Sequence, residues 1–296
     1  MKIYIVNCTL PYLFRGINVS LLNTNASLSL CQRVKNRFAT SPFVPENMEA
    51  YKQLEDADVV ILFGDTKCFI SRCLHIQQHV PSEAMLHLYL WNPISYYQDD
   101  FRLLDHRWTV WSFAKEEAEK NHLRYAETFY NKKLVVPADI QTDLFFVGLG
   151  KNRVGQILQI QEIASAQRLN ADINIVDNLK RLYNSRYVKR MGYEEVRMRV
   201  ARTKALIDIM QSGQSGMTQR VMEALFFKKK LVTNNAFVKK CRFYTPENVF
   251  IIGEDKWENL SEFVSTPCSD ISGFDMTIYD VENWLQRIIQ KEDFHE

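Results

Sequence analysis

The chain has 296 residues, a length at which a single hydrophobic core usually gives way to two domains. Hydrophobic residues make up 46% and charged residues 24%, which is an ordinary composition for a globular protein. The net charge of +2 is too small to indicate a nucleic-acid-binding protein, and no apolar run approaches the roughly 20 residues of a membrane-spanning helix. We therefore expect a cytoplasmic protein that binds no nucleic acid.

Strands and helices alternate through the first half of the chain. The expected strands are rich in β-branched and aromatic residues: 2–8, 58–63, 86–91 and 108–113. The expected helices lie within 20–38, at 46–54, at 67–79 and after Ser112. The strand DVVILF at 58–63 is apolar almost throughout, which is typical of a parallel sheet covered by helices on both faces.

The same alternation restarts in the second half. The expected strands are 143–147, 171–176, 204–210, 231–233 and 248–252. The expected helices are 154–169, 193–202, one that follows 216, 257–264 and 281–290. Two such runs predict two Rossmann-like α/β domains with a cleft between them, at 1–135 and 136–296. The last helix is a candidate to pack back on the N-terminal domain.

The most informative stretch is 211–234, QSGQSGMTQRVMEALFFKKKLVTN, which predicts a loop, a helix and a strand in quick succession. Gly213 and Gly216 alternate with two serines, either of which can cap the following helix. A glycine-rich loop before a helix N-terminus is a ready site for an anion such as phosphate. Glu223 is expected on the polar face of the helix, where its carboxylate can accept hydrogen bonds from sugar hydroxyls.

A second loop of this kind, 148–153, also follows a strand and precedes a helix. It begins with Gly148 and contains the cations Lys151 and Arg153. In open α/β sheets such loops lie at the carboxyl ends of the strands, where ligands bind. Two such loops in one domain can bind a diphosphate, one through its backbone N–H groups and the helix dipole and the other through the charge of its side chains. Alternatively, the glycines only end the strands tightly and the cations are solvated.

The residues 215–225, SGMTQRVMEAL, followed by the strand KLVT, resemble the donor-binding segment of the GT-B glycosyltransferases. Many members carry a Glu-x7-Glu element there. Glu223 falls on the second glutamate, which in the family binds the ribose of the sugar nucleotide, and Ser215 takes the place of the first. Lys151 and Arg153 fall where the family places its diphosphate-binding cations. The donor site implied by the resemblance comprises Gly148, Lys151, Arg153, Gly213, Ser215, Gly216, Met217, Thr218, Arg220 and Glu223.

The whole chain is similar to small glycosyltransferases of bacterial capsule and lipopolysaccharide gene clusters. This resemblance implies a GT-B fold and transfer of a sugar, in the hexosyltransferase class, from a nucleotide sugar to a growing surface glycan or a lipid-linked glycan. We expect no metal and no cofactor, because cations and a helix dipole can stabilise the leaving diphosphate. Peripheral contact with the inner face of the plasma membrane is a further expectation. Two alternatives are a transferase of glycerol phosphate or pyruvyl groups, and a catalytically inactive subunit that binds a sugar nucleotide or glycan.

An inverting transfer also needs a base, which we expect in the N-terminal domain together with the acceptor site. Asp65 is the first candidate because it follows the buried strand at 58–63. Asp99 and Asp100, in the segment SYYQDDF, are the next. Alternatively, Asp65 caps the following helix, and Asp99 and Asp100 are simply exposed acids. No histidine or cysteine spacing indicates a metal site.

Overall fold

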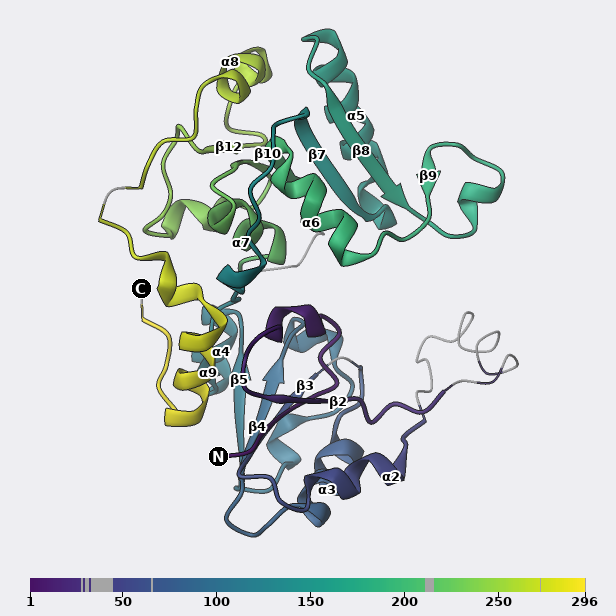
Figure 1. The fold of residues 1–296 in the computed structure, drawn as a ribbon, viewed down its shortest axis with the longest axis vertical. Coiled ribbons are helices and arrows are strands. Elements are labelled where there is room, and N and C mark those ends of the chain that lie inside the picture. The colour runs from purple at the N-terminus through teal and green to yellow at the C-terminus, as the bar shows by residue number, and fades with distance from the viewer. Residues whose placement is uncertain are drawn as a thin grey trace. The chain divides into compact units, whose positions relative to one another are not determined.

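The computed structural model describes residues 1–27, 29, 32, 45–64, 66–210, 216–271 and 273–295. The chain folds into two compact units, shown in Figure 1. The first unit contains residues Met1–Glu127 and Trp284–His295, and the second contains Thr128–Asn283. The first unit thus ends before the expected boundary at residue 135, and it includes most of the last helix, α9 (Val281–Gln290).

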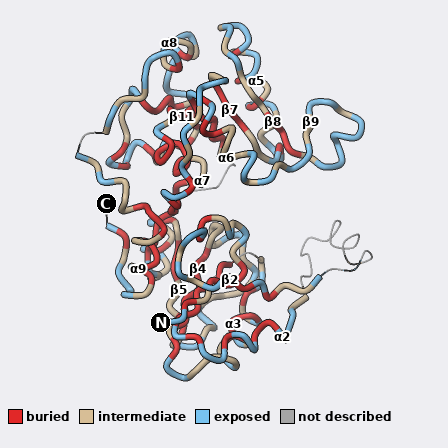
Figure 2. Tube along the Cα trace, in the orientation of Figure 1, coloured by how far each residue is buried: buried red, intermediate tan, exposed pale blue. Residues whose placement is uncertain are grey.

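The first unit is built on a six-stranded parallel sheet in the order β2-β1-β3-β4-β5-β6. The strands are β1 Ile3–Val6, β2 Ser20–Leu22, β3 Val59–Phe63, β4 Met85–Leu90, β5 Trp108–Ser112 and β6 Arg124–Tyr125. Besides α9, the helices are α2 Met48–Tyr51, α3 Ile70–His79 and α4 Lys115–Asn121. The 3-10 helices are η1 Pro11–Phe14, η2 Lys52–Leu54, η3 Ile94–Tyr96 and η4 Phe101–Leu103. Every residue of β3 is buried, as its apolar sequence predicts (Figure 2).

The second unit repeats this plan with the strand order β12-β11-β10-β7-β8-β9, again all parallel. The strands are β7 Thr142–Leu149, β8 Ala171–Val176, β9 Tyr187–Val188, β10 Thr203–Asp208, β11 Lys230–Thr233 and β12 Val249–Ile251. The helices are α5 Val154–Ala166, α6 Tyr193–Ala201, α7 Gln219–Phe226 and α8 Leu260–Ser265. The 3-10 helices are η5 Lys132–Leu134, η6 Lys151–Arg153, η7 Lys180–Leu182, η8 Ala236–Lys240, η9 Trp257–Asn259 and η10 Met276–Tyr279.

The order in which strands are added to the second sheet reverses between β7 and β10, although all the strands are parallel. It builds outward from β7 to β9, then returns to lay β10 beside β7, with Leu206 opposite Phe145, and builds outward again to β12. At such a reversal the connections diverge and leave a crevice at the carboxyl edge of the sheet. The two glycine-containing loops follow β7 and β10, so the topology brings them to one place.

The predicted α/β class, with two parallel sheets, is confirmed. Within 20–38, part of which is expected to be helical, residues 20–22 form the edge strand β2 and bury Leu22 beside β1. Most of the remainder of that segment lies outside the described residues. The short strands β6 and β9 have two residues each, too few to show a period in the sequence.

Aromatic packing fixes the end of the chain to the first unit. Trp284 of α9 is fully buried, and its ring centroid lies 5.9 Å from that of Phe63 and 5.1 Å from that of Tyr89. Burying a tryptophan side chain removes one of the largest apolar surfaces of the chain from water.

In the described part of the chain, no helix has the length and apolarity to cross a membrane.

Candidate functional site

The backbone at the start of α7 presents two N–H groups that donate to no residue in the described part of the chain. Gly216 has φ of +80°, in the left-handed region that favours glycine, and its carbonyl accepts a hydrogen bond from Asn235 Nδ2 at 3.0 Å. The carbonyl of Met217 accepts one from Thr128 Oγ1 at 2.7 Å. Because a trans peptide sets its N–H opposite its carbonyl, the N–H groups of Met217 and Thr218 point away from these partners. Neither N–H donates to a described residue, so both can bind an anion.

Thr218 caps α7 and links it to the end of β10. Its Oγ1 accepts the N–H of Val221 at 3.3 Å and donates to Asp208 Oδ1 at 3.0 Å. The prediction that a serine of the preceding loop caps this helix is wrong, because the helix begins only at Gln219. Two predicted site residues, Gly213 and Ser215, lie outside the described residues.

Asp208 places a buried carboxylate at the carboxyl edge of the second sheet. Its Oδ2 accepts a hydrogen bond from Thr233 Oγ1, at the end of the neighbouring β11, at 3.0 Å. Burial raises the pKa of Asp208, while the two threonine hydroxyls and the charges of Arg220 and Arg153 oppose the rise. Asp208 is not among the predicted site residues, although a carboxylate that ends an apolar strand is a recognisable signal.

Glu223 is buried and paired with Arg220. Only 3% of its surface is exposed, and Arg220 Nη1 donates to its Oε2. The expectation of a polar, exposed face is therefore wrong: from Val221 to Phe226 every residue of α7 is buried, Glu223 included. Burial raises the pKa of Glu223, and the charge of Arg220 and a hydrogen bond from Tyr193 oppose the rise. The Tyr193 hydroxyl also bonds that of Tyr130, and no pattern in the sequence marks either tyrosine.

Arg153 ties the loop after β7 to the loop after β10. Its Nη1 donates to the carbonyl of Ile209, and its Nε donates to that of Leu149 at 3.1 Å. A Cβ at Gly148 would lie 3.1 Å from Arg153 Nη2, so this glycine leaves room for the guanidinium group. Burial lowers the pKa of Arg153, and the nearby Arg220 also lowers it, against the opposing charge of Asp208.

Arg220 and Lys151 add two more cations near the end of β7. The Arg220 guanidinium lies 5.7 Å from the ring centroid of Phe145, and its Nη2 donates to the carbonyl of Val147 at 3.4 Å. Lys151 is exposed, and its side chain makes no hydrogen bond or ion pair with a described residue. Three positive charges, two N–H groups that donate to no described residue, and two buried carboxylates therefore gather at the switch point of the sheet. Such a site can bind an anion that carries neighbouring hydroxyl groups.

A cavity of the second unit lies on another face of α7. It has a volume of about 590 Å³, and its walls include Val221, Ala224, Leu225 and Phe274. None of the buried carboxylates or arginines of the switch point lines it, so we do not place the functional site there. The described residues also contain no group of three His, Cys, Asp or Glu side chains that could hold a metal ion.

The acids predicted as bases have different surroundings in the first unit. Asp65 lies outside the described residues. Asp99 Oδ2 accepts the backbone N–H of Phe69 at 2.6 Å and that of the next residue at 2.7 Å, and so it caps the start of α3. Asp100 caps η4 and pairs with Arg102 at 2.7 Å. The catalytic role of all three acids stays a prediction.

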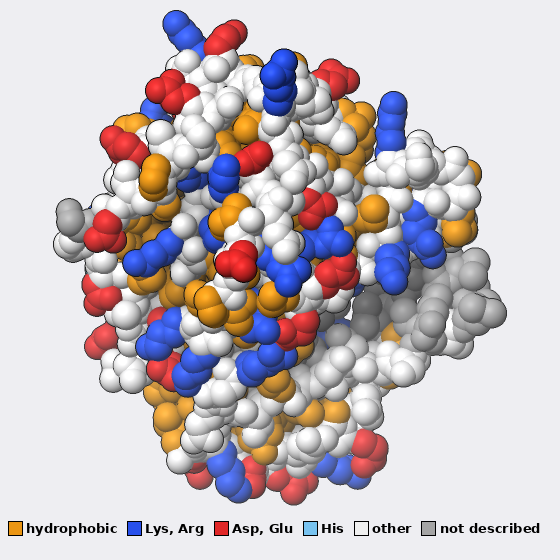
Figure 3. Space-filling model, turned by 45° about the horizontal axis from the view of Figure 1, so that its top comes forward, with side chains coloured by type: hydrophobic (Ala, Val, Ile, Leu, Met, Phe, Trp, Pro, Cys, Tyr) orange, Lys and Arg blue, Asp and Glu red, His pale blue; other side chains and the backbone are white. Residues whose placement is uncertain are grey.

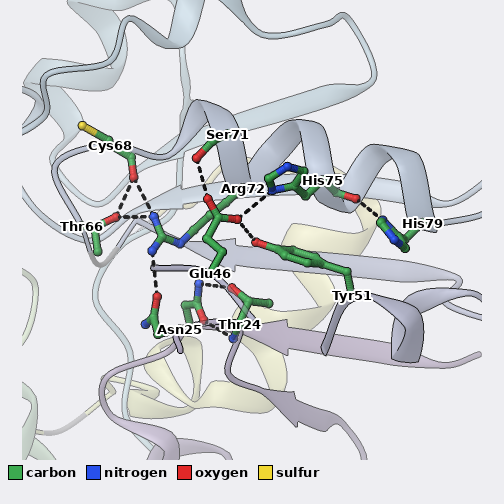
Figure 4. A network of polar contacts seen from close by, with 11 residues as sticks. Thr24, Asn25, Glu46, Tyr51, Thr66, Cys68, Ser71, Arg72, His75 and His79 are labelled. Atoms are coloured by element: carbon green, nitrogen blue, oxygen red, sulfur yellow. Dashed lines mark hydrogen bonds and ion pairs between the residues drawn. The ribbon is translucent and has the colours of Figure 1, made fainter. Parts of the chain in front are cut away.

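A polar network joins α3 to the carboxyl edge of the first sheet (Figure 4). Glu46 accepts hydrogen bonds from the side chains of Tyr51, Ser71 and His75. The buried Arg72 donates to Thr66, Cys68 and Asn25 at 2.8–3.0 Å. Although burial by itself raises the pKa of Glu46, the hydrogen bonds that Glu46 accepts and the charge of Arg72 hold this pKa below its ordinary value. The network therefore holds α3 against the carboxyl edge of the first sheet through charged and hydrogen-bonded side chains.

A small pocket adjoins this network at the ends of β1 and β2. Its volume is about 220 Å³, and its polar lining includes Asn7, Asn23 and Asn25. The Asn7 side chain bonds Thr24 through both its amide nitrogen, at 2.9 Å, and its amide oxygen, at 2.8 Å. The pocket thus has a rigid wall rich in amide groups, which can bind hydroxyl groups.

No protein-family model matches this sequence, and no curated protein matches it in sequence. Solved structures do match it in fold. HepE of Anabaena, determined in complex with UDP, is 13% identical with a TM-score of 0.54 and covers 99% of this chain and 96% of its own. Sucrose-phosphate synthase of Thermosynechococcus elongatus is 11% identical with a TM-score of 0.51 and covers 98% and 94%. A glycosyltransferase of Rickettsia africae is 11% identical with a TM-score of 0.51 and covers 99% and 94%.

At this level of identity the likeness concerns the fold and not the activity. In all three proteins the match extends over nearly the whole of both chains, so it includes both α/β units. The chain therefore has the two-domain α/β fold of the GT-B type.

Proposed function

We propose that this protein is a glycosyltransferase that takes its sugar from a nucleotide sugar. The observation that carries the proposal is the switch point of the second sheet, where the N–H groups of Met217 and Thr218, several cations and a buried glutamate meet. A diphosphate matches the N–H groups and cations, and a ribose matches the glutamate. The structure of HepE with UDP supports the choice of a nucleotide, because that protein shares the fold.

In the proposed complex the diphosphate binds the N–H groups of Met217 and Thr218 together with Lys151 and Arg153. The ribose hydroxyls donate to Glu223. Positive charge at this place stabilises the diphosphate as it leaves, which is the task a metal ion performs in other transferases. We therefore propose that neither a metal nor a cofactor takes part.

The acceptor would bind in the first unit, with the amide-lined pocket at the ends of β1 and β2 as the proposed place for a sugar ring. A base removes the proton from the acceptor hydroxyl while its oxygen attacks the anomeric carbon and the bond to the diphosphate breaks. Asp65 stays our proposed base, because Asp99 and Asp100 already serve as caps. A growing surface polysaccharide or lipopolysaccharide is the proposed acceptor.

The proposal is tested by binding of UDP and uridine to the variant with Lys151→Ala and Arg153→Ala. Charge-assisted hydrogen bonds contribute about 1.5–3 kcal/mol each, so calorimetry should show UDP binding weakened by roughly 100-fold or more and uridine binding little changed. Lys204→Ala is the matched control, since Lys204 is an exposed cation of the same unit that pairs with Asp143 at the start of β7. Equal losses for both ligands would rule out a diphosphate site.

Turnover is tested with the wild-type protein and a panel of donors. Slow hydrolysis of a bound UDP-sugar without acceptor is the expected result. Hydrolysis of CDP-glycerol, or reaction with phosphoenolpyruvate, in place of any sugar nucleotide would show a transferase of a different group. Tight binding of a sugar nucleotide with no turnover in the presence of glycan acceptors would show a binding subunit instead of an enzyme.

A further inference from the structure

The segment between β8 and α6 exposes apolar side chains to solvent. We call residues 177–190 the basic loop; it contains η7 and β9. Leu179 is 42% exposed, Leu182 is 70% exposed and Tyr183 is 77% exposed. Large apolar side chains this accessible are costly to hydrate, and three of them within five residues form a patch instead of scattered single exposures.

The same loop carries a dense positive charge. Its cations are all exposed: Lys180, Arg181, Arg186, Lys189 and Arg190. None of them forms an ion pair with another residue in the described ranges. Figure 3 shows lysine and arginine side chains next to hydrophobic ones at the right of the view, where the β9 segment projects in Figure 1.

The single acid of the loop does not offset this charge at its tip. Asp177 Oδ1 accepts the N–H groups of Leu179 and Lys180, both at 3.0 Å, so this carboxylate is turned into the base of η7. Further along, the side chains of Asn184 and Asn178 accept the N–H groups of Arg186 and Arg190. These local hydrogen bonds hold the loop in one shape with its apolar and cationic side chains outward.

We propose that the basic loop docks this protein on an anionic lipid bilayer. Leucine and tyrosine side chains enter the interfacial region, where an aromatic ring with a hydroxyl group is favoured, and the surrounding cations attract the acidic headgroups. Stable peripheral binding requires both components, because neither a few charges nor three apolar side chains suffice alone. None of these residues belongs to the proposed donor site, so the inference stands apart from the proposed function.

The same side chains match a nucleic acid less well than they match a lipid bilayer. Phosphate recognition would use the cations but would leave Leu182 exposed, and the chain as a whole has a net charge of only +2. An anionic bilayer uses both components of the loop. Single-stranded RNA therefore serves as the competing ligand in the test.

The test is sedimentation of the full chain with vesicles of phosphatidylcholine containing one-third phosphatidylglycerol, against vesicles of phosphatidylcholine alone. We expect binding to the acidic vesicles that falls as salt is added. Each cation near an anionic surface strengthens partitioning by about fivefold, so Arg181→Gln with Arg186→Gln should weaken it by roughly 30-fold. Leu182→Ser with Tyr183→Ser should weaken it by about tenfold at unchanged charge.

Matched controls come from exposed residues of the first unit. Lys115→Gln with Lys120→Gln removes two exposed cations of α4, and Leu103→Ser removes a leucine that is 74% exposed. Both controls should bind vesicles like the wild type. Binding equal on the two kinds of vesicle, equal losses in the controls and the loop variants, or binding of RNA without binding of acidic vesicles would each overturn the proposal.

Discussion

Replacing Glu223 by glutamine tests whether the ion pair with Arg220 supports the fold of the second unit. The substitution keeps the shape of the side chain and one acceptor oxygen, but it removes the negative charge. Glu223 is 3% exposed, and the side chain of Arg220 is 15% exposed. The positive charge of Arg220 would therefore stay largely buried without its counter-charge.

The expected cost follows from this burial. Removing one partner of a buried ion pair destabilises a protein by about 3–5 kcal/mol. Glutamine still accepts a hydrogen bond, and Arg220 keeps its contact with the ring of Phe145, so we expect the lower end, about 3 kcal/mol. For a domain of this size, 1 kcal/mol lowers the Tm by about 2–4 °C, which gives a decrease of roughly 6–12 °C. If the pair were exposed, it would contribute only about 0.3–0.5 kcal/mol.

The assay is thermal and urea unfolding of Glu223→Gln, Arg220→Gln and the double variant. The double variant should be less destabilised than the sum of the single variants, because it leaves no uncompensated charge. Glu195→Gln is the control, since Glu195 is exposed and pairs with Arg199 one turn away on α6. A Tm of Glu223→Gln within the error of the wild type would refute the reasoning and show that the pair contributes no more than an exposed one.

Three further predictions concern single contacts. Asp99→Ala should destabilise the first unit by about 1 kcal/mol in urea unfolding, because α3 loses its cap; unchanged stability would leave Asp99 available as a base. Burial lowers the pKa of His87 to about 4, below the value near 6.5 of an unfolded histidine, so the unfolded state binds more protons between these values. Stability should therefore fall as the pH decreases from about 6.5 to about 4, by roughly 3 kcal/mol from this group. His87→Gln, which keeps an acceptor for Trp111, should remove that part of the slope, and an unchanged slope would contradict the assignment. Gly148→Ala should displace the Arg153 guanidinium and weaken UDP more than uridine in calorimetry; equal weakening would show that Gly148 matters only for folding.

The sequence predicts the fold well where the apolar residues follow a single pattern, either a continuous run or the helical repeat of 3.6 residues. Apolar strands such as 58–63 and amphipathic helices such as 281–290 appear within one or two residues of their expected ends. The edge strands β2, β6 and β9 are not predicted, because they have only two or three residues and owe their existence to pairing with a neighbour. The edge strand β12 is the exception, since the apolar residues at 248–252 predict it. Pairing across a sheet depends on residues far away in the chain, which no local pattern records.

For the candidate site, the sequence predicts the positions of the loops better than the state of the side chains. Gly148, Arg153 and Arg220 lie at the switch point, as glycine-containing loops after strands indicate. The burial of Glu223 could not be predicted from the spacing of polar residues on α7. Other parts of the protein cover this helix on its polar face as well as on its apolar face, so every residue from Val221 to Phe226 is buried. Tyr193 enters the site from α6, and its contribution depends on tertiary packing alone.

The burial of Glu223 has a consequence for the proposed donor site. Its carboxylate already engages Arg220 and Tyr193, so ribose hydroxyls can reach it only if one of these partners moves. Arg220 is the partner that a diphosphate would attract, because phosphate competes with carboxylate for a guanidinium group. If the proposed function holds, the diphosphate draws Arg220 away and leaves Glu223 Oε2 able to accept a hydrogen bond from the ribose. The diphosphate and the ribose then bind cooperatively. Such coupling explains how a buried ion pair can serve both the stability of α7 and the choice of ligand, since uridine alone binds without opening the pair and so lacks the contact with Glu223.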